Sequence, residues 1–195
     1  MDKPFVYDKY VTGRSFVGRK ADCNILGNLL EAGEQVVMYE PPKSGKMSVI
    51  QQTLFNMRSK GRQFLVIHVN MFNVRTLSDF LKKFGSAVIR PVFSTAEEYS
   101  DVVSRHLADT GFVFDQERFA AFDEVVSIKG VPDAHDVEMM IRLPFALAEE
   151  KGYPYYIILE EFQNILNDDE GEMALKVMET VLAEKNRNAS MIFTG

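Results

Sequence analysis

Residues 36–48 constrain the fold of this chain more than any other stretch. A short apolar run at 36–39 leads into a loop rich in proline and glycine, and an amphipathic helical pattern begins at Lys46. A strand, a loop and a helix in this order bring backbone N–H groups and a helix N-terminus onto one anion. The stretch therefore predicts a phosphate-binding loop in an α/β protein.

The loop departs at two positions from the usual pattern, G-x-x-x-x-G-K-[ST]. Gly45 and Lys46 are kept, but Glu40 replaces the first glycine and Met47 replaces the Ser or Thr. A Glu40 carboxylate at ~5 Å from a phosphate, with an effective dielectric of about 20, costs roughly 3 kcal/mol, or about a hundredfold in affinity. The cost vanishes if the side chain points away. Met47 has no oxygen for Mg²⁺, so we expect hydrolysis to suffer more than binding.

The remaining loop residues supply the predicted nucleotide site. Lys46 places a positive charge on the β- and γ-phosphates, and the amides around it cradle them. Ser48 is the next hydroxyl, but one residue along a helix is rotated by about 100°, so it does not simply replace position 47. Ser44 is the other hydroxyl on the loop. The predicted phosphate-binding residues are Pro42, Lys43, Ser44, Gly45, Lys46, Met47 and Ser48.

Strands and helices alternate along the rest of the chain. Apolar runs predict strands at 35–39, 63–70, 155–159 and 190–194, and helical periodicity predicts helices that end near Gly33 and Ser59 and at 76–90, 136–150 and 172–185. The run at 63–70 is nearly continuous in apolar residues, as in a strand covered on both faces of a parallel sheet. We predict a P-loop NTPase-like three-layer α/β sandwich with a mostly parallel sheet, which spans residues 1–195 as one domain.

Two parts of the chain interrupt this alternation. Residues 91–133 are less regular and rich in aromatic residues, and we interpret them as a helical insertion with short helices near 96–109 and 115–127. Pro144 lies inside the helix predicted at 136–150 and predicts a kink or a break there.

Glu160 and Glu161 follow directly after the apolar run at 155–159. We expect this strand to lie beside the loop strand, so that its terminal carboxylates reach a metal and the attacking water. Glu160 is then the metal-side acid, one methylene longer than the usual Asp, and Glu161 is the candidate catalytic base. The alternative is a pair of acids that only favour a helix dipole.

Four motifs in order resemble the AAA/STAND-related P-loop ATPases, in particular the archaeal-type ATPase group and its bacterial relatives. They lie at 16–19 (FVGR), 41–46 (PPKSGK), 157–163 (IILEEFQ) and 192–195 (IFTG). The resemblance implies ATP or ADP and Mg²⁺ as ligands, and a helical lid with a winged-helix or nuclease-like region further along. It also places Gly18 and Arg19 beside the adenine; the alternative is a simple turn ahead of a helix.

Composition limits the classes of function. The net charge of −6 argues against a nucleic-acid clamp, because such domains carry a basic surface. A single cysteine, Cys23, excludes an internal disulfide and suits a reducing cytoplasm. No apolar run has transmembrane length, and the first residues do not form the start of a signal peptide. Separately, we expect His68, which lies in an apolar run, to be in the core or near the site. The last predicted strand stops abruptly, so we expect the front portion of a longer protein.

The sequence thus predicts an ATP-binding domain with impaired or absent hydrolysis that couples nucleotide state to a C-terminal region. If active, it is a hydrolase that converts ATP to ADP and phosphate. One rival is a pseudo-ATPase scaffold, favoured by Glu40 and Met47; replacing them with Gly and Thr restores turnover if only they block it. Another is a nucleic-acid-associated regulator that acts through a region after Gly195. We expect a nucleotide and a protein partner or self-association, and no membrane.

Overall fold

A four-stranded parallel sheet forms the centre of the protein. The computed structural model describes residues 10–13, 16–41, 43–121, 124–167, 169–184 and 187–195. The strands of the central sheet, in the order β1-β6-β5-β2, are β1 (Val36–Met38), β6 (Ala189–Thr194), β5 (Tyr155–Glu160) and β2 (Leu65–Asn70). All of their pairings are parallel, as the apolar runs predict.

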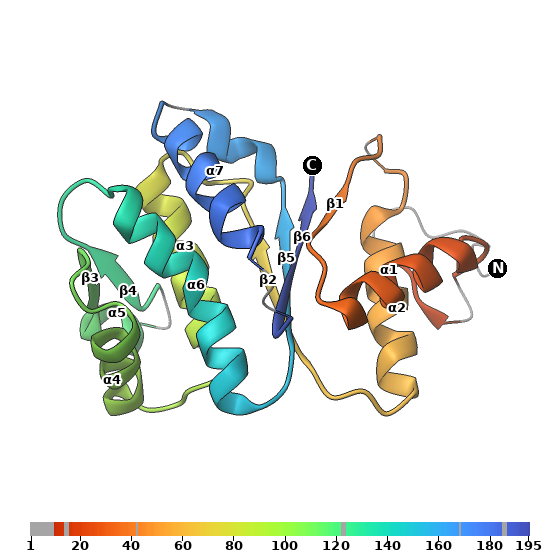
Figure 1. The fold of residues 1–195 in the computed structure, drawn as a ribbon, viewed down its shortest axis with the longest axis horizontal. Coiled ribbons are helices and arrows are strands. Elements are labelled where there is room, and N and C mark those ends of the chain that lie inside the picture. The colour runs from red at the N-terminus through yellow and green to blue at the C-terminus, as the bar shows by residue number, and fades with distance from the viewer. Residues whose placement is uncertain (1–9, 14–15, 42, 122–123, 168, 185–186) are drawn as a thin grey trace.

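Helices cover both faces of this sheet, which makes three layers (Figure 1). One face carries α1 (Lys20–Ala32) and α2 (Lys46–Ser59); the other carries α3 (Leu77–Ile89), α6 (Ala134–Lys151) and α7 (Asp169–Leu182). Alternate side chains of β5 enter two separate cores: Tyr156 and Ile158 pack with α1 and α2, and Ile157 packs with the helices opposite. The predicted three-layer sandwich is confirmed. None of the helices described is long and apolar enough to cross a lipid bilayer.

The sheet order corrects one expectation. The acidic strand β5 does not lie beside the loop strand β1, because β6 lies between them and pairs with both. Met38 is in register with Thr194, Thr194 with Glu160, and Glu160 with Asn70, so these residues form one row across the sheet. Neighbouring strands are about 4.8 Å apart, so the backbones of β1 and β5 are separated by roughly 10 Å. Alternation of strands and helices along a sequence does not determine this order.

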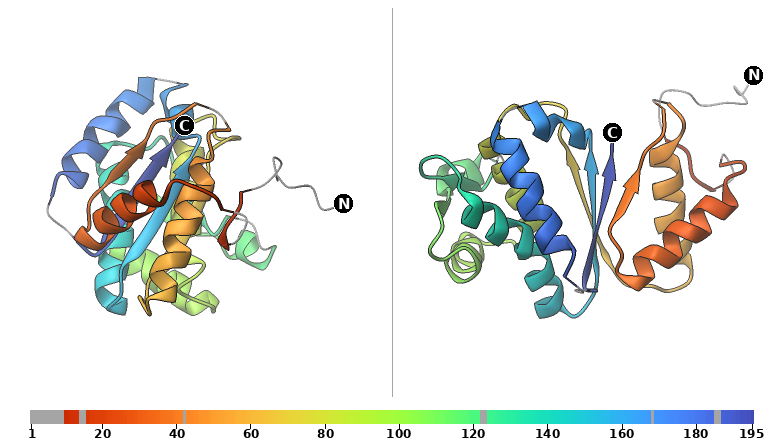
Figure 2. Two further views of the ribbon diagram at one scale, coloured as in Figure 1. Left: turned by 90° about the vertical axis from the view of Figure 1, so that its right-hand side faces the viewer. Right: turned by 45° about the horizontal axis from the view of Figure 1, so that its top comes forward.

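The end of this row lies at the carboxyl edge of the sheet, together with the loop from β1 to α2 (Figures 1 and 2). Met38 packs with the core under α1 and α2, and in-register residues of a parallel sheet share one face. Thr194, Glu160 and Asn70 therefore face the same side as α2. The topology thus brings the loop, the acidic strand and the end of β6 to one edge.

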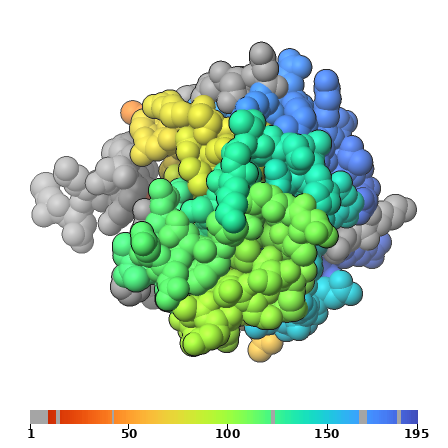
Figure 3. Space-filling model, turned by 90° about the vertical axis from the view of Figure 1, so that its left-hand side faces the viewer, coloured from red at the N-terminus to blue at the C-terminus, as the bar shows by residue number. Residues whose placement is uncertain are grey.

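The described residues of 91–133 contain two helices and a small second sheet. The first predicted helix is α4 (Ala96–His106), which opens with a capping box between Thr95 and Glu98. In place of the second predicted helix are α5 (Gln116–Ala120) and β4 (Val126–Ile128), and β4 pairs antiparallel with β3 (Phe112–Phe114). Buried Ser86 Oγ accepts hydrogen bonds from two amides at the start of β4, at 2.8 and 3.3 Å. This region covers the outer side of α3 and α6 and forms much of the surface in Figure 3.

Pro144 does not break α6, which runs as one helix of 18 residues. A proline removes one intrahelical donor, and here the helix is held at both ends. Asp133 and Asp136 form a capping box at its start, and Gly152 ends it in the left-handed conformation with φ 74°. Burial of Pro144 between apolar neighbours offsets the lost hydrogen bond.

Candidate phosphate and nucleotide site

The first turn of α2 opens toward the carboxyl edge of the sheet without a side-chain cap. Gly45 precedes this turn with φ 90°, and no side chain among the described residues accepts a hydrogen bond there. The first amides of an α-helix have no partner inside the helix, so they remain available to an anion. Gly45 keeps the left-handed backbone that favours glycine and lets these amides face the loop.

Lys46 joins the loop to the end of β6. Its Nζ donates to the backbone oxygen of Glu40 at 2.7 Å and to that of Gly195 at 2.7 Å. Both partners are neutral carbonyls rather than carboxylates. A phosphate oxygen is a stronger partner for an ammonium group than a carbonyl, so the lysine charge is available to an anion in the loop.

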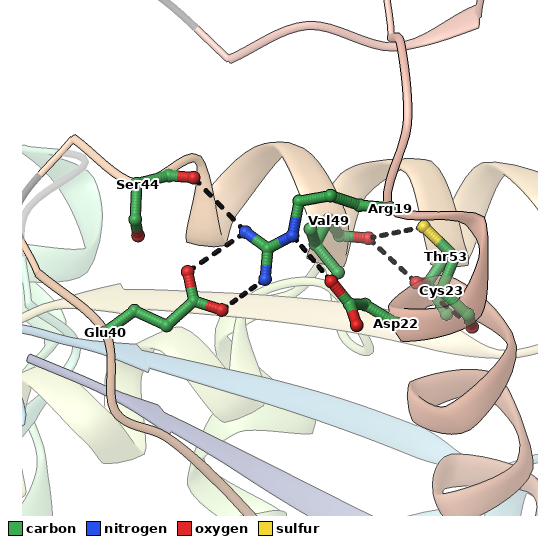
Figure 4. Close-up of polar contacts among 7 residues, drawn as sticks. All are labelled: Arg19, Asp22, Cys23, Glu40, Ser44, Val49 and Thr53. Carbon is green, nitrogen blue, oxygen red and sulfur yellow. Dashed lines mark hydrogen bonds and ion pairs between the residues drawn. The ribbon is translucent and has the colours of Figure 1, made fainter.

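The Glu40 side chain is bound by Arg19 (Figure 4). Arg19 Nη1 donates to Glu40 Oε2 at 3.0 Å, and Nη2 donates to Oε1. The guanidinium also donates to Asp22 Oδ2 at 2.6 Å and to the Ser44 backbone oxygen at 3.2 Å. The hydrogen bonds from Arg19 hold the pKa of the Glu40 carboxyl below its ordinary value, and those to Glu40 and then Asp22 raise the pKa of the Arg19 guanidinium.

This pairing changes the expected effect of Glu40 on phosphate affinity. The cost of about a hundredfold in affinity applies to an unpaired carboxylate that faces the phosphates. In the structure an opposite charge lies within hydrogen-bonding distance of both carboxylate oxygens, so Arg19 and Glu40 together present almost no net charge to the loop. Sequence reasoning missed this pair, because 21 residues separate its members.

Gly18 and Arg19 form a left-handed turn ahead of α1, with φ 80° and 52°. Arg19 is the residue before the first turn of α1, and its side chain extends from there to the loop. The turn and the Arg19 contacts bring this segment against the loop between β1 and α2. A role beside an adenine remains a prediction.

The side chains of Met47 and Ser48 have contacts within the chain. Met47 packs, half-buried, against the core under α1 and α2. Ser48 Oγ accepts a hydrogen bond from the Val11 amide at 3.0 Å. Neither contact leaves a hydroxyl at the position where a metal ligand is expected. Pro42 lies outside the described residues.

Glu160 is held by two side chains at the end of β2. His68 Nε2 lies 3.1 Å from Glu160 Oε2, and Asn70 Nδ2 donates to the same oxygen at 2.9 Å. His68 thus lies beside Glu160, in agreement with the expected core or near-site position. Asn70 was missed, although its position as the last, polar residue of an apolar strand was a usable signal.

Glu161 leaves the strand in a different direction. Its φ of 58° turns the chain into a 3-10 helix (Phe162–Asn167), and its Oε2 accepts a hydrogen bond from Gln163 Nε2 at 2.7 Å. Gln163 in turn lies against Gly195, where an added Cβ would collide with its Oε1. The two acids therefore have separate environments, Glu160 with β2 and Glu161 with the end of β6.

Backbone strain gathers around this edge. Four described residues other than glycine have a left-handed φ, and Arg19, Lys43 and Glu161 are three of them. Each such residue costs about 1–3 kcal/mol and persists where the surrounding structure holds it, often at binding sites. The sheet edge that carries the loop is therefore also the strained part of the described chain.

The donor set suits a nucleotide better than a metal held by protein alone. No group of three or more His, Cys, Asp or Glu side chains in the described part of the chain is arranged to hold a metal ion. Glu160 supplies one carboxylate, so a Mg²⁺ ion there would take its other ligands from phosphates and water. Lys46 and the uncapped amides of α2, by contrast, are donors of the kind that an anion accepts.

Solved structures with the same fold are ATPases and proteins of the ORC type. The chain is similar to the Aeropyrum pernix ORC1 protein in complex with DNA (13% identity, TM-score 0.51, over 92% of this chain and 39% of that one). It is similar to the Walker-type ATPase PABY2304 of Pyrococcus abyssi (14%, TM-score 0.57, over 99% and 49%). It is also similar to the Aeropyrum pernix ORC2 protein in ADPNP–ADP complexes (13%, TM-score 0.53, over 97% and 44%).

At these identities the likeness establishes the P-loop ATPase fold. The chain spans less than half of the length of each of these structures. No protein-family model matches the sequence, and no curated protein matches it at the level of sequence.

Proposed function

We propose that this domain binds ATP or ADP through Lys46 and the amides that open α2. The observation that carries the proposal is the Lys46 ammonium group, whose hydrogen-bond acceptors among the described residues are two neutral carbonyls and which lies directly at an uncapped helix N-terminus. Charge and oriented amides together favour a polyphosphate. Residues 43–48 and the segment with Gly18 and Arg19 form the proposed site, and the likeness to an ORC2 structure with ADPNP and ADP supports it.

We propose further that hydrolysis is impaired or absent. A magnesium ion with ATP supplies charge neutralisation in phosphoryl transfer, and a hydroxyl at position 47 is the usual protein ligand. Met47 offers a thioether that packs into the core instead. Glu160 remains the proposed metal-side acid and Glu161 the proposed base, although both carboxylates are already hydrogen-bonded within the chain.

The nucleotide state is proposed to act on a region that lies outside this chain. Lys46 contacts the backbone of Gly195, so an anion that draws the lysine into the loop alters a contact at the end of β6. This link supports coupling to a further segment, a protein partner or a second copy. The single cysteine supports our proposal of a cytoplasmic location, and a role on nucleic acid would need a region other than this acidic chain.

Calorimetric titration with ATP and ADP, each with and without Mg²⁺, tests the proposal. The unmodified chain is expected to bind both nucleotides with a weak Mg²⁺ effect. Lys46→Ala is expected to abolish binding, while Lys60→Ala, at the opposite end of α2, is expected to leave it unchanged. Absence of heat and of thermal stabilisation in a folded sample would instead support the nucleotide-free scaffold.

A further inference from the structure

Arg19 contacts three residues in two parts of the chain, the loop after β1 and helix α1. Its guanidinium binds both carboxylate oxygens of Glu40, the backbone oxygen of Ser44 and the carboxylate of Asp22 on α1. Glu40 and Ser44 are the first and fifth residues of the loop, so a single side chain spans the loop from outside (Figure 4). Every nitrogen of the guanidinium has a partner in this chain, which leaves Arg19 suited to hold the loop rather than to bind a ligand directly.

Backbone contacts also restrain the loop at this point, since Lys46 Nζ donates to the Glu40 backbone oxygen at 2.7 Å. Position 40 lacks the glycine that is usual at the start of such a loop. Lys43 adopts a left-handed backbone conformation with φ 61°, which is strained for a residue other than glycine. The Ser44 amide closes a turn onto the Pro41 backbone oxygen at 3.2 Å. The side chains of Arg19 and Glu40 are about one-third and one-quarter exposed, so solvent screens the pair only in part. A bidentate pair of this kind fixes geometry as well as charge.

Contacts continue from Arg19 along the N-terminal segment. The Val11 amide donates to Ser48 Oγ at 3.0 Å, and the Gly13 amide donates to Gln52 Oε1 at 2.6 Å. Both acceptors are on α2, one turn apart. Val11 and Gly13 therefore lie along the first turns of the same helix whose N-terminus belongs to the proposed site.

We propose that Arg19 and Glu40 form an ion-pair clamp that positions the phosphate loop and couples it to the N-terminal segment. Arg19 is a positioning residue in this scheme, and Glu40 is its partner rather than a defect of the loop. The clamp holds the loop in its observed conformation before any ligand arrives, and an anion held by the loop in turn secures residues 10–13 and 16–19. The second half of this scheme rests on the proposed nucleotide binding; the first half does not.

The experiment compares Arg19→Ala, Glu40→Ala and the double variant with the unmodified chain. The double variant leaves the net charge unchanged, so it separates positioning from simple electrostatics. Arg142→Ala with Glu184→Ala is the matched control, because it removes another bidentate pair, on α6 and after α7, without changing the net charge. Amide hydrogen exchange of the nucleotide-free protein is measured at Ser44 and over 43–46, followed by ATP titration.

The clamp predicts about fivefold to tenfold faster exchange at the Ser44 amide in each single variant, and no further increase in the double variant. It also predicts that ATP binds the double variant about tenfold more weakly. The control pair is expected to leave both quantities unchanged. Exchange that stays at the level of the unmodified chain in all three variants would overturn the clamp.

The same measurements separate the two proposals. If the unmodified chain binds no nucleotide while the loop variants exchange faster, the proposed function fails and the clamp stands. If the double variant binds ATP as tightly as the unmodified chain, Glu40 and Arg19 have only opposing electrostatic effects and the positioning role is wrong.

Discussion

Met47→Thr is the substitution that most directly tests the proposal that ATP hydrolysis is impaired because position 47 lacks a hydroxyl ligand for Mg²⁺. Met47 is half-buried against the core under α1 and α2, and it occupies the second helical position of α2. Threonine restores a hydroxyl at the position from which P-loop proteins coordinate Mg²⁺. Loss of part of the methionine packing should cost about 1 kcal/mol of unfolding free energy, which the fold tolerates.

The magnitude follows from the metal. A residue that holds or orients a metal ligand contributes about 10–100-fold in metal affinity. The enhancement of ATP binding by Mg²⁺ should therefore be larger by that factor in Met47→Thr than in the unmodified chain. Because the Glu40 charge is already paired with Arg19, adding Glu40→Gly should give no further gain. The clamp predicts that the double substitution binds ATP more weakly than Met47→Thr alone, which differs from the expectation drawn from the sequence.

Titration with and without Mg²⁺, together with phosphate release, measures both effects. Ser59→Ala is the control, since the Ser59 hydroxyl donates to the Phe55 backbone oxygen at the far end of α2 and should not affect the metal. A Met47→Thr protein that binds ATP but shows the same weak Mg²⁺ effect would refute the reasoning. The defect would then lie at Glu160, which His68 and Asn70 hold away from a metal.

Three further outcomes are expected. Glu160→Gln should abolish the remaining Mg²⁺ effect on ATP binding in calorimetry. It should also lower the melting temperature, because in one orientation the new side-chain NH₂ group faces the Asn70 NH₂ donor. The lowered pKa of Glu40 stabilises the fold above the pKa of the unfolded chain, and this stabilisation is lost as pH falls. Between about pH 5 and 3 the unmodified chain should therefore lose more unfolding free energy than Glu40→Gln in denaturant titrations. Ser86→Ala leaves two buried amides at the start of β4 without their acceptor and should cost about 2–4 kcal/mol by the same assay.

Local patterns in the sequence were sufficient for the elements. The apolar run at 63–70, the Pro/Gly loop at 40–45 and the heptad-like spacing in α3 each depend on neighbours within a few residues. Such periodicity reports which face of an element is buried, so the strands, the main helices and the three-layer class were predictable. The aromatic region at 91–133 was not, because β3 and β4 are three-residue strands without a strong period.

The composition of the candidate site depended on tertiary structure. Gly45 and Lys46 were visible in the sequence because the loop and the helix that present them are contiguous. The pairing of Arg19 with Glu40 joins residues 21 apart, and that of Asn70 with Glu160 joins residues 90 apart. Asn70 and Glu160 meet because parallel strands place their carboxyl ends at one edge, and Arg19 reaches Glu40 because α1 packs against α2. The sequence by itself determined a strand, a loop and a helix in a phosphate-loop pattern with two altered positions, whereas the insertion of β6 between β1 and β5 and the ion pair at Glu40 were decided by long-range packing.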